Sequence, residues 1–193
     1  FVEDFVRAPN NGLRLLLTLL KNLQALSSNP TATTPRAAPK GTLRMDEYKK
    51  NMVDEQDCLL CIKYTLRIRS AVEEILEYNP GLYTVVTCLM SNYSRSRITA
   101  LEILTLILTG PTSVDKVLDA FTSMRIHFAE STRFKILVNM MYTRGVSHVL
   151  FQVSCLRLLN TILNLCRSAN MRVFLQYEME EAGLDLTRLQ EVT

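Results

Sequence analysis

"MRVFLQYEMEEAGL", residues 171–184, combines an apolar stripe, a run of acids and a glycine in one short stretch. Met171, Phe174 and Leu175 lie three and four positions apart, which places them on one face of a helix. The three glutamates that follow gather at the carboxy-terminal end, where a helix dipole favours cations instead. Charge runs of this kind usually form solvated faces. The stretch therefore predicts an amphipathic helix whose acids face water.

The same helical spacing runs through almost the whole chain. No segment shows sustained apolar–polar alternation between hairpin turns, so β-strands are not needed. The clearest apolar ladder comprises Val149, Val153, Leu156, Leu159, Leu163 and Cys166. We expect helices near residues 1–8, 12–26, 44–68, 70–78, 81–91, 95–109, 113–129, 131–143, 146–167, 170–182 and 185–192.

Short helices that alternate with longer ones, each too apolar to stand alone, are typical of an α-solenoid. Three pieces that begin with Gly-Leu, at Gly12, Gly81 and Gly183, add a moderate self-similarity and are expected to begin helices. Near residue 110 a glycine stop precedes Thr112, which we expect to cap the next helix together with Asp115. The fold class predicted from the residues is therefore all-α.

Residues 27–42, "SSNPTATTPRAAPKGT", interrupt this pattern with three prolines and four threonines. The segment predicts a flexible insertion between two helices and not a domain boundary. Serine or threonine beside proline is also a possible phosphorylation site, although a tolerated loop is the simpler interpretation.

The composition excludes several classes of protein. Of 193 residues, 48% are hydrophobic and 21% charged, which is enough for a sizeable core. The net charge of +3 gives no argument for nucleic acid. The longest apolar runs are too short to predict a membrane span. The five cysteines lie in apolar helical patterns, so we expect reduced core thiols and a cytoplasmic protein.

The sequence lacks the usual constellations of catalysis. Its six glycines form no phosphate-binding motif. Its two histidines are not accompanied by a second Cys-x-x-Cys motif, which a zinc site would need besides the one at Cys58 and Cys61. Cys58 and Cys61 have metal-like spacing without the other ligands that a metal site needs. We therefore expect no enzyme, no cofactor and no metal.

A binding module is more plausible, because a solenoid offers a long concave surface to a partner helix. Polar residues on otherwise apolar helices are candidates for that surface, although any amphipathic helix carries such a solvated stripe. The groove candidates are Glu102, Thr105, Thr109, Arg157, Asn160, Thr161 and Asn164.

Six motifs in order resemble the amino-terminal regulatory region of formins, outside the 27–42 insertion. Two are the most specific, "VSCLRLLNTIL" at 153–163 and "MRVFLQYEMEEAGL" at 171–184. The others are "CLLCIKYTL" (58–66), "ALEILTLIL" (100–108), "ESTRFKILVNMM" (130–141) and, more loosely, residues 1–20.

The resemblance implies an armadillo-repeat array, a right-handed superhelix of short helices, as a single regulatory domain over residues 1–193. It implies that the module binds a Rho-family GTPase (Rho, Rac or Cdc42). The concave groove would take a carboxy-terminal autoregulatory helix, in cis or in trans. Competition between the two would control actin assembly indirectly, at the cytoskeleton or cell cortex.

Two positions depart from the family pattern. Leu66-Arg67 stands where most relatives have Met-Asn, so the GTPase-contact candidates are Arg67, Ile68 and Arg69. Arginine in place of asparagine changes both the hydrogen-bond geometry and the charge. Thr161 replaces a small alanine of the groove. The parent resembles either a complete formin or the multiple-wing-hairs type, which lacks an actin-nucleating domain. An alternative function is a generic armadillo scaffold that binds a linear peptide without a GTPase.

Overall fold

The computed structural model describes residues 2–7, 9–28, 42–143 and 148–187, and these residues contain helices but no β-strand. One short 3-10 helix, η1 (Cys88–Met90), follows α5. The α-helices are α1 (Val2–Val6), α2 (Gly12–Ser28), α3 (Thr42–Thr65), α4 (Arg69–Glu77), α5 (Asn79–Thr87), α6 (Ser94–Ile107), α7 (Pro111–His127), α8 (Lys135–Met141), α9 (His148–Asn164) and α10 (Ala169–Glu181).

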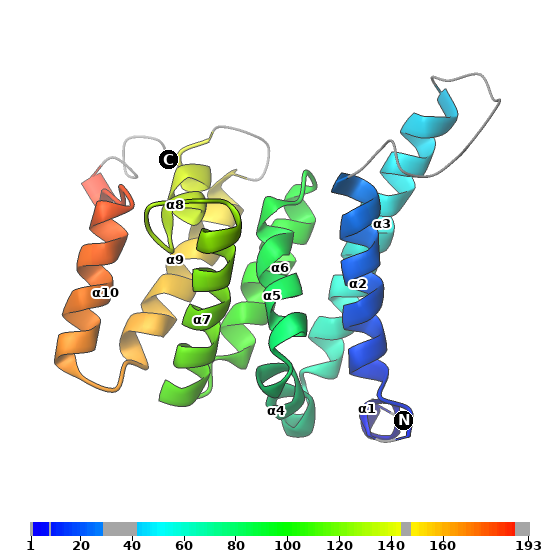
Figure 1. The fold of residues 1–193 in the computed structure, drawn as a ribbon, viewed down its shortest axis with the longest axis horizontal. Helices are drawn as coiled ribbons and strands as arrows, with labels where there is room; N and C mark the ends of the chain where they lie inside the picture. Colours follow the sequence, from blue (N-terminus) through cyan, green and yellow to red (C-terminus); the bar gives the residue numbers. More distant parts are fainter. Residues whose placement is uncertain (1, 8, 29–41, 144–147, 188–193) are drawn as a thin grey trace.

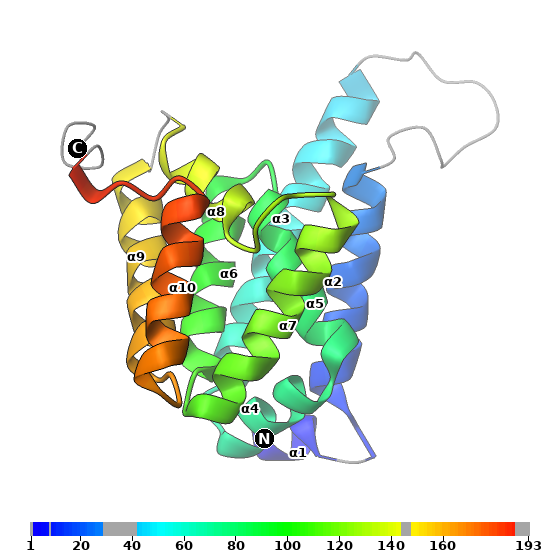
Figure 2. The same ribbon diagram turned by 60° about the vertical axis from the view of Figure 1, so that its left-hand side comes forward.

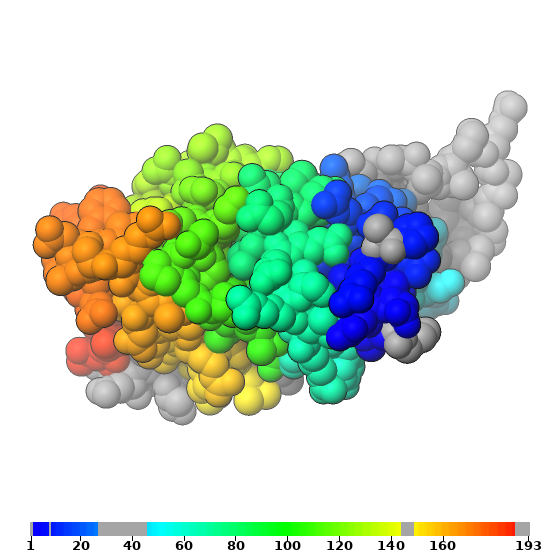
Figure 3. Space-filling model, turned by 90° about the horizontal axis from the view of Figure 1, so that it is seen from below, coloured from blue at the N-terminus to red at the C-terminus, as the bar shows by residue number. Residues whose placement is uncertain are grey.

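The long helices lie in two rows that follow the chain from one end of the molecule to the other. In one row α3 packs on α6 and α6 on α9, and in the other α2 packs on α5 and α5 on α7 (Figures 1 and 2). Contacts between α2 and α3 and between α5 and α6 join the rows, and α10 packs on α9. Figure 3 shows successive segments in chain order along the long axis. The predicted all-α, armadillo-like solenoid is confirmed.

The core is continuous because each helix turns its aliphatic ladder between the rows. Phe121 of α7 and Phe134, just before α8, are the largest fully buried side chains, and their ring centroids lie 5.7 Å apart. Leucines from other layers, such as Leu20, Leu59 and Leu101, are also fully buried. The single hydrophobic cluster includes buried residues of α1 through α10.

Several predicted boundaries need correction. The helix expected over 131–143 is only α8, Lys135–Met141. Its start is displaced because the backbone N–H of Arg133 donates to the Glu178 carboxylate, 3.3 Å away, instead of joining a helical ladder. Most of the helix expected over 185–192 and most of the 27–42 insertion lie outside the described residues.

The stretch 171–184 forms α10 and its carboxy-terminal turn, but its faces differ from the prediction. Leu175 is buried and Met171 half-buried, whereas Phe174 is 55% exposed. Glu178 is buried, so the expectation that all three glutamates face water is wrong at this position. The reason is an arginine from a distant segment, described below.

Four of the five free thiols lie at least partly inside, but Cys61 is exposed, so the expectation of a core thiol is wrong there. Cys61 shares an outward strip of α3 with Asp57 and Tyr64, both also exposed. Cys58, one turn away, faces α2, and burial raises the pKa of its thiol to about 12.

The expected cap of α7 is also wrong. The N-cap residue is Gly110, and the Ser113 hydroxyl accepts its backbone N–H at 3.1 Å. Pro111 occupies the first turn, where its missing N–H costs nothing. Asp115, expected to complete a capping box, pairs instead with Arg167.

The Gly-Leu pieces have two different roles. Gly12 begins α2 as expected. Gly183 instead ends α10, because its N–H donates to the Glu180 carbonyl at 2.8 Å and that of Leu184 to the Met179 carbonyl at 3.0 Å. These two bonds form a Schellman motif, which needs a left-handed residue, and Gly183 has φ of +100°.

We expect Gly183→Ala to lower the free energy of unfolding by about 1–2 kcal/mol, because an L-residue is strained at this φ. Thermal unfolding measures the effect as a fall of a few degrees in Tm. Gly110→Ala is the matched control, since its φ of 177° is extended and an added Cβ would meet no atom within 4 Å. Equal melting temperatures for the two variants would contradict the assignment of Gly183.

Candidate functional site

The outer surface of the α3, α6 and α9 row carries the residues that the sequence singled out. A hollow of about 240 Å³ opens where the three helices meet. Its lining residues are Lys63, Glu102, Thr105, Leu106, Ser154 and Arg157. Three of the seven groove candidates therefore lie together, two from α6 and one from α9.

A second hollow, of about 320 Å³, continues the first along α3. Lys63 and Leu106 line both hollows, and Leu60, Tyr64, Leu66 and Arg67 complete the second. We call the two together the α3–α6–α9 groove. It brings Arg67, a GTPase-contact candidate, to the same surface as the groove candidates.

The charges of this groove are mostly positive. Lys63 pairs with Glu102 at 2.9 Å, and both side chains are about one-third exposed. Arg157 and Arg67 line the two ends of the groove. The Arg67 guanidinium lies 4.7 Å from the centroid of the Tyr64 ring, which holds it against the wall. Three cations against one carboxylate favour an anionic partner.

Apolar side chains remain exposed beside these charges. Leu106 is 49% exposed and Tyr64 58%. On α9, Val153 and Leu150 are exposed one and two turns before Arg157. A partner with an apolar stripe and acidic flanks would match this combination.

The remaining candidates are more scattered. Asn160 lines a different hollow of about 460 Å³ between α9 and α10, together with Met179 and Leu184. Thr161 donates its hydroxyl to the Arg157 carbonyl at 2.7 Å. Thr109, Thr161 and Asn164 line none of these three hollows.

Ile68 and Arg69 are not brought to the groove beside Arg67. Ile68 is the N-cap residue of α4 and packs against the core. Arg69 begins α4 and pairs with Glu73 at 3.0 Å. The turn between α3 and α4 thus separates three residues that are adjacent in sequence.

Sequence reasoning missed six residues of the groove, namely Lys63, Tyr64, Leu106, Ser154, Leu60 and Leu66. A signal for the first two was present, because they precede Arg67 by one helical turn and must share its face. Among the described residues no three His, Cys, Asp or Glu side chains are grouped as metal ligands. No described helix is long and apolar enough to cross a membrane.

The comparisons with known proteins agree with this architecture. Residues 114–192 match the family described as the Diaphanous FH3 Domain. The chain is 25% identical over 225 residues to Formin-like protein 1 of Homo sapiens, with 96% of this chain and 20% of that protein covered. It is 24% identical over 173 residues to Formin-like protein 3 of Homo sapiens, with 83% and 17% covered.

The chain therefore spans about a fifth of the length of these relatives. The resemblance to a formin amino-terminal regulatory region is confirmed. Such a region is a regulatory, non-catalytic kind of module.

Proposed function

We propose that this chain, an amino-terminal regulatory region of the formin type, binds a Rho-family GTPase and an amphipathic autoregulatory helix. The GTPase (Rho, Rac or Cdc42) contacts the surface around Arg67. The helix, supplied in cis or in trans, lies in the α3–α6–α9 groove. The module acts in the cytoplasm, at the cytoskeleton or cell cortex, and affects actin only indirectly.

One observation supports this function above the others. Glu102, Thr105 and Arg157 line one hollow, and this hollow continues past Leu106 to Arg67. A helix in the groove and a GTPase at Arg67 would therefore meet at shared residues. Binding of one reduces the affinity for the other by the same factor in both directions, as linkage requires.

The chemistry of the groove specifies the helix. Leu106 and Tyr64 offer apolar surface to residues spaced at i, i+3, i+4 and i+7 of a partner helix. Arg67 and Arg157, at opposite ends, favour acidic residues at both ends of that helix. Thr105 adds no free hydroxyl proton, since it donates to the Leu101 carbonyl at 2.8 Å.

We expect Arg67→Asp to weaken binding of the GTP-loaded GTPase by about tenfold or more. The substitution replaces a positive charge by a negative one, which would repel the anionic surface that we propose for the partner. The circular-dichroism melt should hardly change, since Arg67 is exposed. Isothermal titration with each GTP-loaded GTPase measures the affinity. Lys50→Asp is the matched control, because it reverses the charge of an exposed residue in the first half of α3.

Wild-type affinity in Arg67→Asp would remove this residue from the GTPase site. If none of the three GTPases binds in either nucleotide state, the alternative of a generic armadillo scaffold gains support. Such a scaffold would bind a linear peptide with an affinity that does not depend on the nucleotide state of any GTPase. Substitution of Asn160 or Thr161 would abolish this peptide binding. The 460 Å³ hollow that Asn160 lines would offer such a peptide a site, and Thr161 lies one residue further along α9 without lining it.

A further inference from the structure

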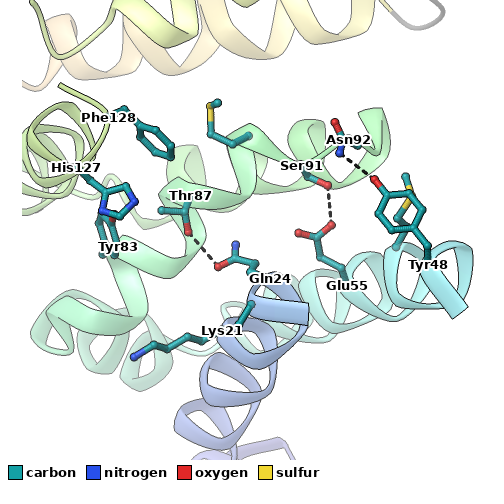
Figure 4. A pocket seen from close by; sticks show the side chains of 13 residues that line it. Lys21, Gln24, Tyr48, Glu55, Tyr83, Thr87, Ser91, Asn92, His127 and Phe128 are labelled. Carbon is teal, nitrogen blue, oxygen red and sulfur yellow. Dashed lines mark hydrogen bonds between the residues drawn. The ribbon is translucent and has the colours of Figure 1, made fainter. Parts of the chain in front are cut away.

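A pocket of about 370 Å³ lies on another side of α3, between α2, α5, η1 and the end of α7 (Figure 4). It shares no lining residue with the α3–α6–α9 groove. Its volume is within the range of small-ligand sites. The functions considered above leave it unused.

Glu55 is the most buried polar residue among those that line this pocket. Glu55 is only 5% exposed, and its Oε2 accepts a 2.6 Å hydrogen bond from the Ser91 hydroxyl. Within the described part of the chain no ion pair involves Glu55. The Ser96 hydroxyl and the Cys88 thiol also lie against this carboxyl. A carboxylate accepts about four hydrogen bonds, so some acceptor capacity remains. Burial raises the pKa of Glu55, as expected for a carboxyl that has lost water without gaining a cation.

The one lysine of the wall does not neutralise this charge. Lys21 lines the pocket, but Figure 4 shows its ammonium group pointing away from Glu55. The Asn92 side chain donates to the Tyr48 hydroxyl at 2.8 Å. This bond holds the Tyr48 oxygen at the same end of the pocket as the Glu55 carboxylate. The polar part of the pocket therefore offers oxygen acceptors around one buried negative charge.

The opposite part of the pocket is aromatic. The His127 ring meets the Tyr83 ring edge-on with centroids 6.4 Å apart, and it meets the Phe128 ring in the same way at 4.8 Å. All three rings line the pocket. Aromatic faces attract planar cations, and arginine stacks on them more often than lysine.

We propose that this pocket binds a guanidinium group on an aliphatic stem, as in an arginine side chain of a protein partner. The guanidinium pairs with the Glu55 carboxylate through parallel N–H donors, and its flat face lies against the aromatic wall. The same chemistry occurs in free alkylguanidines. An arginine side chain on a partner and a free small molecule are therefore the two sources that the test must separate.

The test uses two probes on the whole chain, N-acetylarginine N-methylamide for a peptide-borne side chain and agmatine for a free alkylguanidine. Proton–nitrogen NMR at millimolar probe concentration follows the amide signals of Ser91 and Asn92. We expect saturable shifts, and the tighter of the two probes identifies the source. The citrulline analogue of the first probe, which has the same shape without the charge, should not bind.

We expect Glu55→Gln to weaken binding by about tenfold or more, because the charge is lost while the shape remains. Lys21→Gln should strengthen binding by about two- to threefold, because it removes a like charge from the wall. Glu181→Gln, an exposed carboxylate of α10 that lines neither this pocket nor the α3–α6–α9 groove, is the matched control and should leave the affinity unchanged. Because the two sites share no lining residue, the guanidinium proposal and the proposed GTPase and helix function can fail separately.

Three outcomes would overturn the proposal. The first is no shift with either probe in a protein whose spectrum is well dispersed. The second is equal binding of the arginine and citrulline probes. The third is unchanged affinity in Glu55→Gln with an unaltered melting temperature.

Discussion

Phe121→Ala is expected to lower the free energy of unfolding by about 3–5 kcal/mol, the usual cost of a large cavity in a close-packed core. Phe121 has no exposed surface, and its ring packs against that of Phe134 with centroids 5.7 Å apart. These rings join α7 to the segment before α8. A protein of this size loses about 2–4 °C for each kcal/mol, so Tm should fall by roughly 10 °C.

Urea unfolding followed by circular dichroism measures this loss, and Phe174→Ala is the matched control. This control makes the same substitution on α10, where Phe174 is 55% exposed. We therefore expect it to lower the free energy of unfolding by less than about 1 kcal/mol. Similar losses for both variants would show that the two rings are equally buried and would contradict the packing of α7. An unfolded Phe121→Ala protein would still agree, and Phe121→Leu then gives a smaller, measurable loss.

Most of the fold follows from local sequence, and the reason is physical. In a solenoid each helix packs against helices that are near it in sequence. An apolar ladder such as Val153, Leu156 and Leu159 therefore indicates which face of its helix packs against a neighbouring helix. Val153 nevertheless proved exposed at 48%, because the ladder is wider than the contact with α6. Periodicity gives the existence of a helix but not the edge of its buried face.

The candidate site was found only in part. Glu102, Thr105 and Arg157 were predicted together because helices of one row present the same kind of face. Ile68 and Arg69 were grouped with Arg67 because they are adjacent in sequence, but the turn into α4 separates them. No local pattern shows such a change of direction.

Buried acids were the least predictable feature. Glu55 and Glu178 both stand among other polar residues in sequence, which indicates a solvated strip. Their burial depends on partners far along the chain, Ser91 for Glu55 and Arg133 for Glu178. A single sequence shows the charge of a residue but not the distant group that will donate to it or pair with it.

The contact between Arg133 and Glu178 joins the segment before α8 to α10. The Arg133 Nε lies 2.9 Å from Oε1 of Glu178, and a second guanidinium nitrogen lies 2.5 Å from Oε2. The side chains are 17% and 11% exposed. Such a two-pronged pair, largely removed from water, is strong only while both partners remain.

Arg133→Ala is therefore expected to destabilise the protein by about 3 kcal/mol, because it leaves a buried carboxylate without its cation. Chemical denaturation measures this against Arg69→Ala, which breaks an exposed pair with Glu73 and should cost no more than about 0.5 kcal/mol. The double variant Arg133→Met with Glu178→Leu should recover most of the loss, since an apolar pair of similar size needs no compensation. If the double variant were as unstable as Arg133→Ala, the loss of stability would not come from the unpaired charge of Glu178. The stabilising factor would then be the contact of the Arg133 guanidinium group with Phe174, whose ring centroid lies 6.0 Å from the guanidinium carbon.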